Sequence, residues 1–280
     1  LYPVGTPYLC PLDGNVYVTT QEGGASNCGT IYRYLRGSET YQQVYALGCA
    51  PEGDTPEDAL TDVGGVLEAT SSYGGPSNVG ALIFVRSDGS TGTGCNFSGS
   101  NGAYPNAAII QANGNSYTGA QGGGLNGDGT ITKFQGVTCN TSVLHNFAGG
   151  SDGQNPNGSL LFYKNALYGT TVYGGTGTNL GTVFKIGLDG AGYTILHVFQ
   201  GICCGNSDGS FPEAGLALNP KDGMLYGTTY NGGNSSDFGT VFKIDPDTGA
   251  ETVVHDFSGN DGAHPDSSLY ITKRAKVTAP

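Results

Sequence analysis

The chain has 280 residues, of which 50 are glycine and none is tryptophan. Its formal net charge of −12 argues against nucleic acid and anionic membrane surfaces as partners, because proteins bind both through Lys and Arg. No run of about 18 apolar residues occurs, so we expect no membrane insertion. No signal peptide is visible at Leu1, so we expect a mature, processed form.

One pattern of strands and glycines repeats five times along the chain. Each copy has an anchor residue in a strand, then a Gly-Gly pair, and then a glycine that opens a second strand 12 or 13 residues after the anchor. Successive anchors are 49 to 58 residues apart. The anchors are Tyr17, Glu68, Tyr117, Tyr168 and Tyr226. A period of this length predicts a repeat architecture, in which one unit cannot bury its apolar face alone.

Each copy then continues in the same order. A turn such as Leu188-Asp189-Gly190 follows, and Asp-Gly is a hairpin signal because glycine accepts a positive φ. A third strand comes next, for example residues 193–199, and then a Gly/Asp loop that ends in proline. Three residues later a fourth strand leads into the next anchor. Four short strands in about 50 residues, without a helical period, predict an all-β, five-bladed β-propeller.

We expect a single domain over residues 1–280, with repeats at about 7–55, 56–104, 105–155, 156–211 and 212–264 and a closing or donated strand in 265–280. The proline with its following strand occurs six times, near Pro7, Pro56, Pro105, Pro156, Pro212 and Pro265. Five anchors use five of these strands, so one strand at a terminus is surplus. It either stays on its own chain or is donated to a neighbouring subunit in a head-to-tail polymer.

The repeated motifs resemble the tandem-repeat family nicknamed GloVer. Leu225-Tyr226-Gly227-Thr228-Thr229 and Gly239-Thr240-Val241-Phe242 carry the resemblance most clearly. The match is close over about residues 156–265, fair in the third repeat and weaker in the first two, where Glu68 replaces an anchor tyrosine. The resemblance implies a secreted or surface-anchored extracellular repeat protein, and it carries over no catalytic residue.

Cysteines and glycosylation sequons together indicate an oxidising, extracellular compartment. The cysteines form no CxxC pair, which argues against a zinc site, and their disulfide connectivity is left open. Their odd number leaves one thiol free or shared between chains. The disulfide candidates are Cys10, Cys28, Cys49, Cys95, Cys139, Cys203 and Cys204. N-glycosylation is expected at Asn96, Asn140, Asn157 and Asn234, with the last two best placed in glycine-rich loops.

Three histidines, His145, His197 and His255, occupy the same place in successive repeats. A repeated position predicts a repeated structural role, such as a bond from the imidazole to the backbone of a neighbouring blade. The alternative is a ring of imidazoles that binds a metal, but Cys95 replaces the histidine in the second repeat. His264, in the loop before Pro265, is expected to be solvated.

The remaining candidates also favour structure over chemistry. The loops at 149–153, 206–209 and 259–262 contain Asp and Asn, but they have too few carboxylates for Ca²⁺, so we expect Asx turns. Glu68 is the carboxylate that departs most from its repeat, and drift is the simpler explanation. We therefore expect no catalytic residue, no metal and no cofactor.

The sequence favours a secreted, N-glycosylated, non-enzymatic β-propeller that serves as an extracellular structural or interaction module. Terminal strand exchange or β-augmentation would let it assemble with itself into head-to-tail filaments, and extracellular glycans or proteins are the other expected partners. A carbohydrate-binding propeller is the alternative, supported by 17 tyrosines. A polysaccharide hydrolase or lyase that uses Glu68 is the third possibility.

Overall fold

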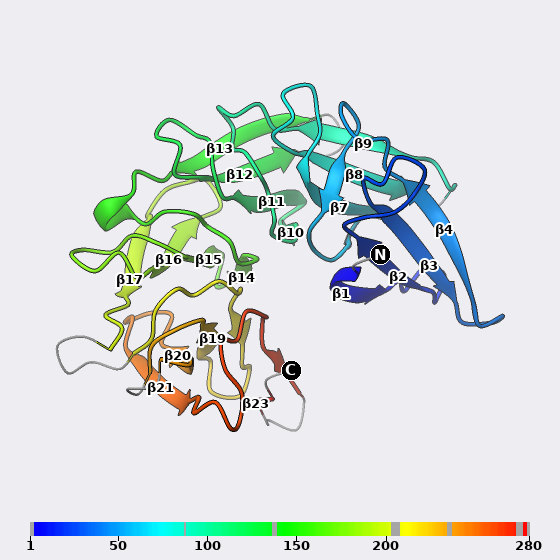
Figure 1. The fold of residues 1–280 in the computed structure, drawn as a ribbon. Helices are drawn as coiled ribbons and strands as arrows, with labels where there is room; N and C mark the ends of the chain where they lie inside the picture. Colours follow the sequence, from blue (N-terminus) through cyan, green and yellow to red (C-terminus); the bar gives the residue numbers. More distant parts are fainter. Residues whose placement is uncertain are drawn as a thin grey trace. The chain divides into compact units, whose positions relative to one another are not determined.

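The protein is built of antiparallel strands in the computed structural model, which describes residues 3–86, 88–135, 139–202, 208–233, 237–272 and 277–278 (Figure 1). The chain forms two compact units. Unit 1 contains Leu1–Gly124 and Gly129–Val143, and unit 2 contains Leu125–Asp128 and Leu144–Pro280. Among the described residues the helical element is the 3₁₀ turn η2 (Gly150–Asp152), and no helix has the length and hydrophobicity of a membrane span.

Unit 1 contains two complete sheets and most of a third, each with its strands in sequence order. The first sheet is β1 (Pro3–Leu9), β2 (Val16–Thr20), β3 (Thr30–Leu35) and β4 (Thr40–Ala46). The second is β5 (Asp54–Pro56), β6 (Thr61–Val63), β7 (Val66–Tyr73), β8 (Ala81–Arg86) and β9 (Thr91–Asn96), in which β5 and β6 both pair with β7. The third is β10 (Ile110–Ala112), β11 (Asn115–Ala120), β12 (Thr130–Gln135) and β13 (Asn140–Asn146), and β13 crosses the boundary between the units.

Unit 2 repeats the same meander. Its sheets are β14 (Leu161–Tyr163), β15 (Ala166–Thr171), β16 (Thr182–Gly187) and β17 (Thr194–Val198), then β18 (Ala217–Leu218), β19 (Leu225–Thr229), β20 (Thr240–Ile244) and β21 (Glu251–Asp256). A two-stranded hairpin follows, β22 (Tyr270–Ile271) with β23 (Val277–Thr278). The five expected sheets are therefore confirmed, together with a surplus strand, and this strand lies at the C-terminal end because β1 pairs with β2 in the first sheet.

The repeated motif is explained by contacts within one sheet. In the fifth sheet, Gly227 pairs with Phe242, and a Cβ atom on Gly227 would lie 2.5 Å from the phenylalanine ring. The same pairing joins Gly169 to Phe184 in the fourth sheet. Any side chain at the glycine would therefore displace a fully buried ring. This packing explains why Leu-Tyr-Gly-Thr-Thr is followed by Gly-Thr-Val-Phe.

The threonines of the motif connect strands and sheets. In the first, fourth and fifth sheets the second threonine of the anchor strand bonds the threonine that opens the next strand, as in the buried pair Thr171 and Thr182, whose hydroxyl oxygens are 2.7 Å apart. The first threonine instead donates to the following sheet: Thr170 Oγ1 bonds the carbonyl of Ala214 at 3.0 Å. The second threonine thus links two strands of its own sheet, and the first links the sheet to the next repeat.

A glycine–proline contact joins successive sheets. The glycine that opens the Gly-Thr strand has φ near +100°, and the space for its Cβ atom is filled by the proline of the next repeat. At Gly29 and Gly181 the ideal Cβ would lie 2.5 Å from the proline Cδ atom. The pairs in contact are Gly29 with Pro56, Gly80 with Pro105, Gly181 with Pro212 and Gly239 with Pro265. Only glycine fits here, for both steric and conformational reasons.

The residue before each of these prolines has a left-handed backbone. φ lies between 52° and 57° at Thr55, Tyr104, Asn155, Phe211 and His264. This conformation is strained for a residue other than glycine. It aims the backbone N–H at the carbonyl that precedes the strand-opening glycine of the previous repeat, as in the 2.8 Å bond from Phe211 to Leu180. The strain is therefore maintained by a hydrogen bond between repeats.

We predict that Gly181→Ala will lower the free energy of unfolding by about 2–4 kcal/mol, because a methyl group collides with Pro212 and φ is +100°. Gly192→Ala is the matched control, since Gly192 has φ +67° and open space around its Cβ position. It should lose only about 1 kcal/mol. Urea denaturation of both variants measures the difference, and equal losses would contradict the packing argument.

Candidate functional site

Each of the three repeat-equivalent histidines bonds an aspartate in the loop that follows it. His197 Nε2 lies 3.0 Å from Asp208 Oδ2. His145 is 3.1 Å from Asp152, and His255 is 3.1 Å from Asp261. Every imidazole also packs edge-on against the phenylalanine two residues later, with ring centroids 4.8 Å apart. The expected structural role is therefore supported, but the expected partner was wrong: it is an aspartate of the same repeat and not a neighbouring backbone.

The aspartates complete a loop closure that all five repeats share. Asp208 accepts the backbone N–H of Gln200 at 3.0 Å, and Asp152 and Asp261 accept equivalent bonds. In the first repeat Glu52 accepts the N–H of Gly48 at 3.1 Å, and in the second Asn101 accepts that of Ser98 at 2.8 Å. In every repeat, therefore, a side chain of the loop accepts a backbone N–H of the same loop. In three repeats that side chain is an aspartate that also bonds the histidine.

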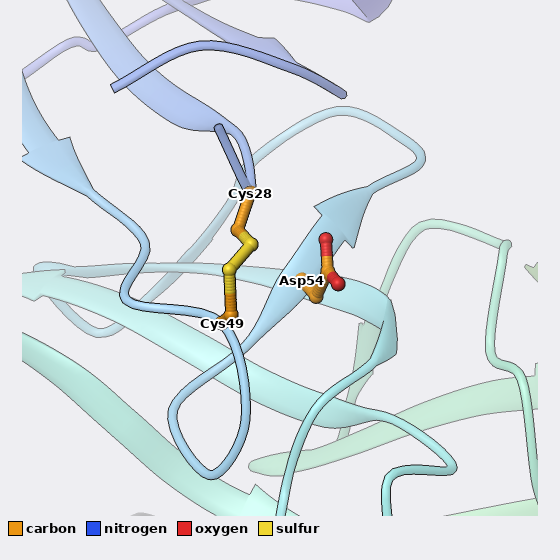
Figure 2. Close-up of side chains that lie close together, drawn as sticks. All are labelled: Cys28, Cys49 and Asp54. Carbon is orange, nitrogen blue, oxygen red and sulfur yellow. A yellow bond between two sulfur atoms is a disulfide. The ribbon is translucent and has the colours of Figure 1, made fainter. Parts of the chain in front are cut away.

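Within the described ranges, the one group of three potential metal ligands is Cys28, Cys49 and Asp54 in unit 1 (Figure 2). Cys28 and Cys49 form a disulfide with Cα atoms 5.2 Å apart, which joins the Gly-Gly loop of the first repeat to the loop after β4. Burial raises the pKa of the Asp54 carboxyl, although a bond from the Thr55 backbone opposes the rise. Because both sulfur atoms are bonded to each other, the group in this state offers a metal only one carboxylate.

The other cysteines divide into a second disulfide, a buried thiol and an undescribed pair. Cys95 and Cys139 are joined, with Cα atoms 4.9 Å apart, so the cysteine at the histidine position ties the second sheet to the third. Cys10 is a free thiol, 4% exposed. Cys203 and Cys204 lie outside the described residues. The disulfides fit an oxidising compartment.

The four sequons stay predictions. Asn96 and Asn140 are exposed, whereas Asn157 is half-buried and donates from Nδ2 to the carbonyl of Glu213 at 3.1 Å. Asn234 lies outside the described residues. The two exposed asparagines are therefore the more accessible to a glycan-transferring enzyme.

Glu68 is buried like the anchor tyrosines of the other repeats, but no cation stands opposite it on the neighbouring strand. The anchor tyrosines pair with Arg33, Lys133, Lys185 and Lys243, but Glu68 pairs with Phe84. The Glu68 side chain is 7% exposed, and burial raises the pKa of its carboxyl. Its two strand partners, Thr61 and Phe84, carry no carboxylate.

Sequence reasoning missed Glu251. This residue of β21 holds the place that Tyr193 holds in the fourth repeat, and Tyr193 stacks on the imidazole of His145 with centroids 3.7 Å apart. Burial raises the pKa of Glu251 to about 7; His197 opposes the rise and Asp208 adds to it. Its buried Oε1 has no hydrogen-bond partner among the described residues. Aligning the third strands by their histidines would have placed it beside the His197–Asp208 pair.

The prediction for His264 was wrong. Its imidazole is half-buried, stacks on Tyr230 with centroids 4.7 Å apart, and places Nδ1 3.0 Å from the Tyr230 carbonyl oxygen. Equivalent aromatic pairs are Tyr73 with Tyr104 and Tyr173 with Phe211. The aromatic residues at the other pre-proline positions were the signal in the sequence that could have revealed this role.

The C-terminal hairpin copies the start of a sheet. Pro265 packs on Gly239, the Oγ of Ser268 accepts the N–H of Gly215 at 3.1 Å, and Leu269 joins the core of the fifth sheet. β22 lies beside β18, as β18 lies beside β14. Tyr270 pairs with Thr278 of β23. In the described part of the chain, β23 pairs on one side only, so its other edge presents backbone donors and acceptors.

Comparisons with known proteins agree with this architecture. A family model described as the Gloeobacter/Verrucomicrobia repeat matches residues 83–278. No curated protein matches the chain.

Three solved structures illustrate the likeness in fold. A Nidogen/Laminin complex matches at 15% identity and a TM-score of 0.59, over 95% of this chain and 84% of that one. A putative TolB from Agrobacterium tumefaciens matches at 14% identity and a TM-score of 0.55, over 96% and 84%. The extracellular domain of a putative one-component system from B. thetaiotaomicron matches at 14% identity and 0.59, over 98% and 31%. The first two contain β-propellers, so the chain has an all-β propeller fold with five sheets as its blades.

We predict that Glu251→Gln will remove one pH-dependent component of stability. The Glu251 pKa rises from its usual 4.5 to about 7 on folding, so the native state favours the protonated form and loses stability as pH rises between these values. A fully buried group with this pKa would cost roughly 3 kcal/mol above pH 7, and solvent screening reduces the cost here to about 1 kcal/mol.

Urea denaturation at pH 5 and pH 8 measures this effect. The variant should match the natural protein near pH 5 and exceed it by about 1 kcal/mol at pH 8. An identical pH dependence in both proteins would show that Glu251 titrates normally.

Proposed function

The chain belongs to the Gloeobacter/Verrucomicrobia repeat family, and from this we propose that it is an extracellular, N-glycosylated structural or interaction module that assembles with copies of itself. The observation that carries the proposal is the hairpin β22–β23, which docks on the fifth sheet as the first two strands of a further sheet. Two disulfides support the extracellular setting.

The outer edge of β23 supports assembly by β-augmentation. In the other sheets the strand at this position receives a third strand, as β19 receives β20 through five residue pairs from Leu225 to Thr229. An added strand from another chain would satisfy the backbone groups of β23 in the same way. Such a contact joins unlike surfaces of two copies, so it extends head to tail and produces a filament.

The chemistry-bearing residues also favour a role without catalysis. The imidazoles of His145, His197 and His255 are occupied by loop aspartates, and those aspartates are occupied by backbone N–H groups. A general base must reach the substrate proton directly or through one water. Because these pairs close the same loop in three repeats, we assign them a structural role.

Carbohydrate binding is the second candidate, and the half-exposed aromatic pairs favour it. Tyr73 is 44% exposed, and Tyr104 and Tyr173 are each 39% exposed. Each belongs to an edge-on pair at the end of an anchor strand, with centroids 5.4 Å apart for Tyr73 and Tyr104 and 5.7 Å for Tyr173 and Phe211. Open aromatic faces at a repeated spacing suit stacking against sugar rings.

We predict that the full chain assembles in a concentration-dependent way and that truncation after Thr272, which removes β23, abolishes assembly. Because β22 and Leu269 are kept, the fifth sheet retains its packing. Multi-angle light scattering and electron microscopy measure the size of both proteins. A strictly monomeric full chain, or equal assembly of the truncated form, would contradict the proposal.

The carbohydrate alternative predicts glycan-array binding that falls about tenfold in Tyr173→Ala. Tyr41→Ala is the control, because Tyr41 is 76% exposed but belongs to no pre-proline pair. Absence of binding to any glycan, or equal loss in both variants, would retire this alternative.

A further inference from the structure

Inside the chain, the outer strand of one sheet is covered by the repeat that follows it. Tyr193 of the fourth repeat stacks on the imidazole of His145 in the third, with ring centroids 3.7 Å apart. The turn glycine Gly190 packs on the backbone of Leu144, where an added Cβ would lie 2.9 Å from the carbonyl oxygen. The side chain of His145 is therefore only 18% exposed, and that of His197, which the fifth repeat covers, is 19% exposed.

The tightness of this cover varies along the chain. Gly249 of the fifth repeat packs on Leu196 as closely as Gly190 packs in the fourth. In the second repeat the equivalent glycine, Gly89, has nothing within 4 Å of its Cβ position. A cavity of about 340 Å³ opens there, lined by Gly89 and by Val44 of the first sheet. The contact between successive sheets thus recurs, although it is looser at the first junction.

Among the described residues, the outer strand of the fifth sheet lacks such a cover. The hairpin that follows supplies β22 and β23, which have two residues each and take the places of a first and a second strand. Val254 is 49% exposed, and the side chains of His255 and its partner Asp261 are 46% and 42% exposed. We call Val254, His255 and Asp261 the open face of the fifth sheet. A third and a fourth strand beside β23 would cover it.

The first sheet carries an uncovered surface of the opposite kind. Tyr32 and Tyr34 alternate along β3, and Tyr34 pairs with Tyr41 of β4, so the three side chains share one side of the sheet. The rings of Tyr34 and Tyr41 lie 5.0 Å apart. On the other side of the sheet, Ile31 joins a core cluster with Leu67 of the second sheet. Tyr32, Tyr34 and Tyr41 therefore form a tyrosine face that points away from the second sheet.

In the later sheets the side that corresponds to the tyrosine face is buried against the preceding sheet. The residues that take the places of Tyr32 and Tyr34 in the fourth and fifth sheets are fully buried: Phe184, Ile186, Phe242 and Ile244. In the first sheet Tyr32 and Tyr34 are only half-buried, and Tyr41 is 76% exposed. In the described part of the chain, the first and fifth sheets thus present the two unmatched halves of the contact that joins the other sheets.

We propose that these halves meet between two copies of the chain: the tyrosine face of one copy packs on the open face of the fifth sheet of another, with β4 as the strand added to β23. The proposal rests on the self-assembly proposed above. A tyrosine ring over His255 would repeat the stack of Tyr193 on His145. Because the two surfaces are unlike, the contact extends head to tail.

The first sheet can reach β23 through β4. The outer edge of β4 pairs with no strand in the described ranges. The opposite edge strand, β1, contains Pro3 and Pro7, which lack the N–H that a ladder needs. When the first sheet is turned end for end in its own plane, β4 lies beside β23 and runs antiparallel to it, while the tyrosine face still points at the fifth sheet.

Two variants that block opposite halves of the contact test the proposal. Tyr41→Asp charges the tyrosine face and Val254→Asp charges the open face, and both positions are exposed, so each chain should fold, which thermal melting checks. By multi-angle light scattering, each variant alone should need at least about tenfold more protein to assemble than the natural chain. At a concentration where neither assembles alone, a mixture should form dimers of one copy of each and nothing larger, because each variant keeps the half that the other has lost.

Leu125→Asp is the matched control, since Leu125 is 85% exposed and belongs to neither face, and it should assemble like the natural chain. If the natural chain assembles and Tyr41→Asp and Val254→Asp assemble equally well, or if their mixture forms no dimer, this contact is overturned while self-assembly stands. A natural chain that stays monomeric overturns both.

Modification of the imidazoles by diethyl pyrocarbonate gives an independent readout. In the assembled protein His255 should react as slowly as His145, whereas in dilute protein it should react faster, because its side chain is the more exposed. A His255 that reacts equally fast in both samples would show that the second copy binds elsewhere.

Discussion

The contact between a strand-opening glycine and the proline of the next repeat is the constraint on which the rest of the structure depends. At Gly181, an L-amino acid would require both a positive φ and the space taken by Pro212. The residue before the proline then reaches back with its N–H to the previous repeat, as Phe211 does to Leu180. Together these contacts set the spacing of one sheet on the next, and they leave the loops that close around them to vary.

Variation in those loops separates structural positions from candidate binding positions. Where the turn glycine packs on the preceding sheet, as at Gly190 and Gly249, the space between the sheets is filled. Where it does not, as at Gly89, a cavity opens between the first two sheets. The C-terminal hairpin also begins like a repeat, because Pro265 packs on Gly239 as the other repeat prolines pack on their glycines. It differs in having no third strand among the described residues, so one edge of β23 is unpaired there. Departures from the repeat are thus where binding chemistry is available.

The sequence predicted the architecture well because the repeat multiplies each local signal. Five copies of a strand opened by glycine identified the five sheets, and the sixth copy of the proline with its following strand identified the extra strand. The site was less predictable, because it depends on contacts between repeats. The aspartate partner of His197 lies 11 residues along a variable loop, and the stacking of His264 on Tyr230 links positions 34 residues apart. The cavity depends on a turn that stays away from Val44, and no composition or motif at Gly89 reveals that distance.

Hydrogen exchange of individual backbone amides tests most directly whether the glycine–proline contact joins the repeats. Four residues that precede a repeat proline donate their backbone N–H to a carbonyl of the preceding repeat, where a glycine packs on that proline. Tyr104, Phe211 and His264 lie in loops, and Thr55 lies in the short strand β5. They should exchange as slowly as the strand amides of their own sheets. Exchange at the rate of an exposed turn amide such as that of Gly192 would contradict this account, because the repeats would then be held together by other contacts.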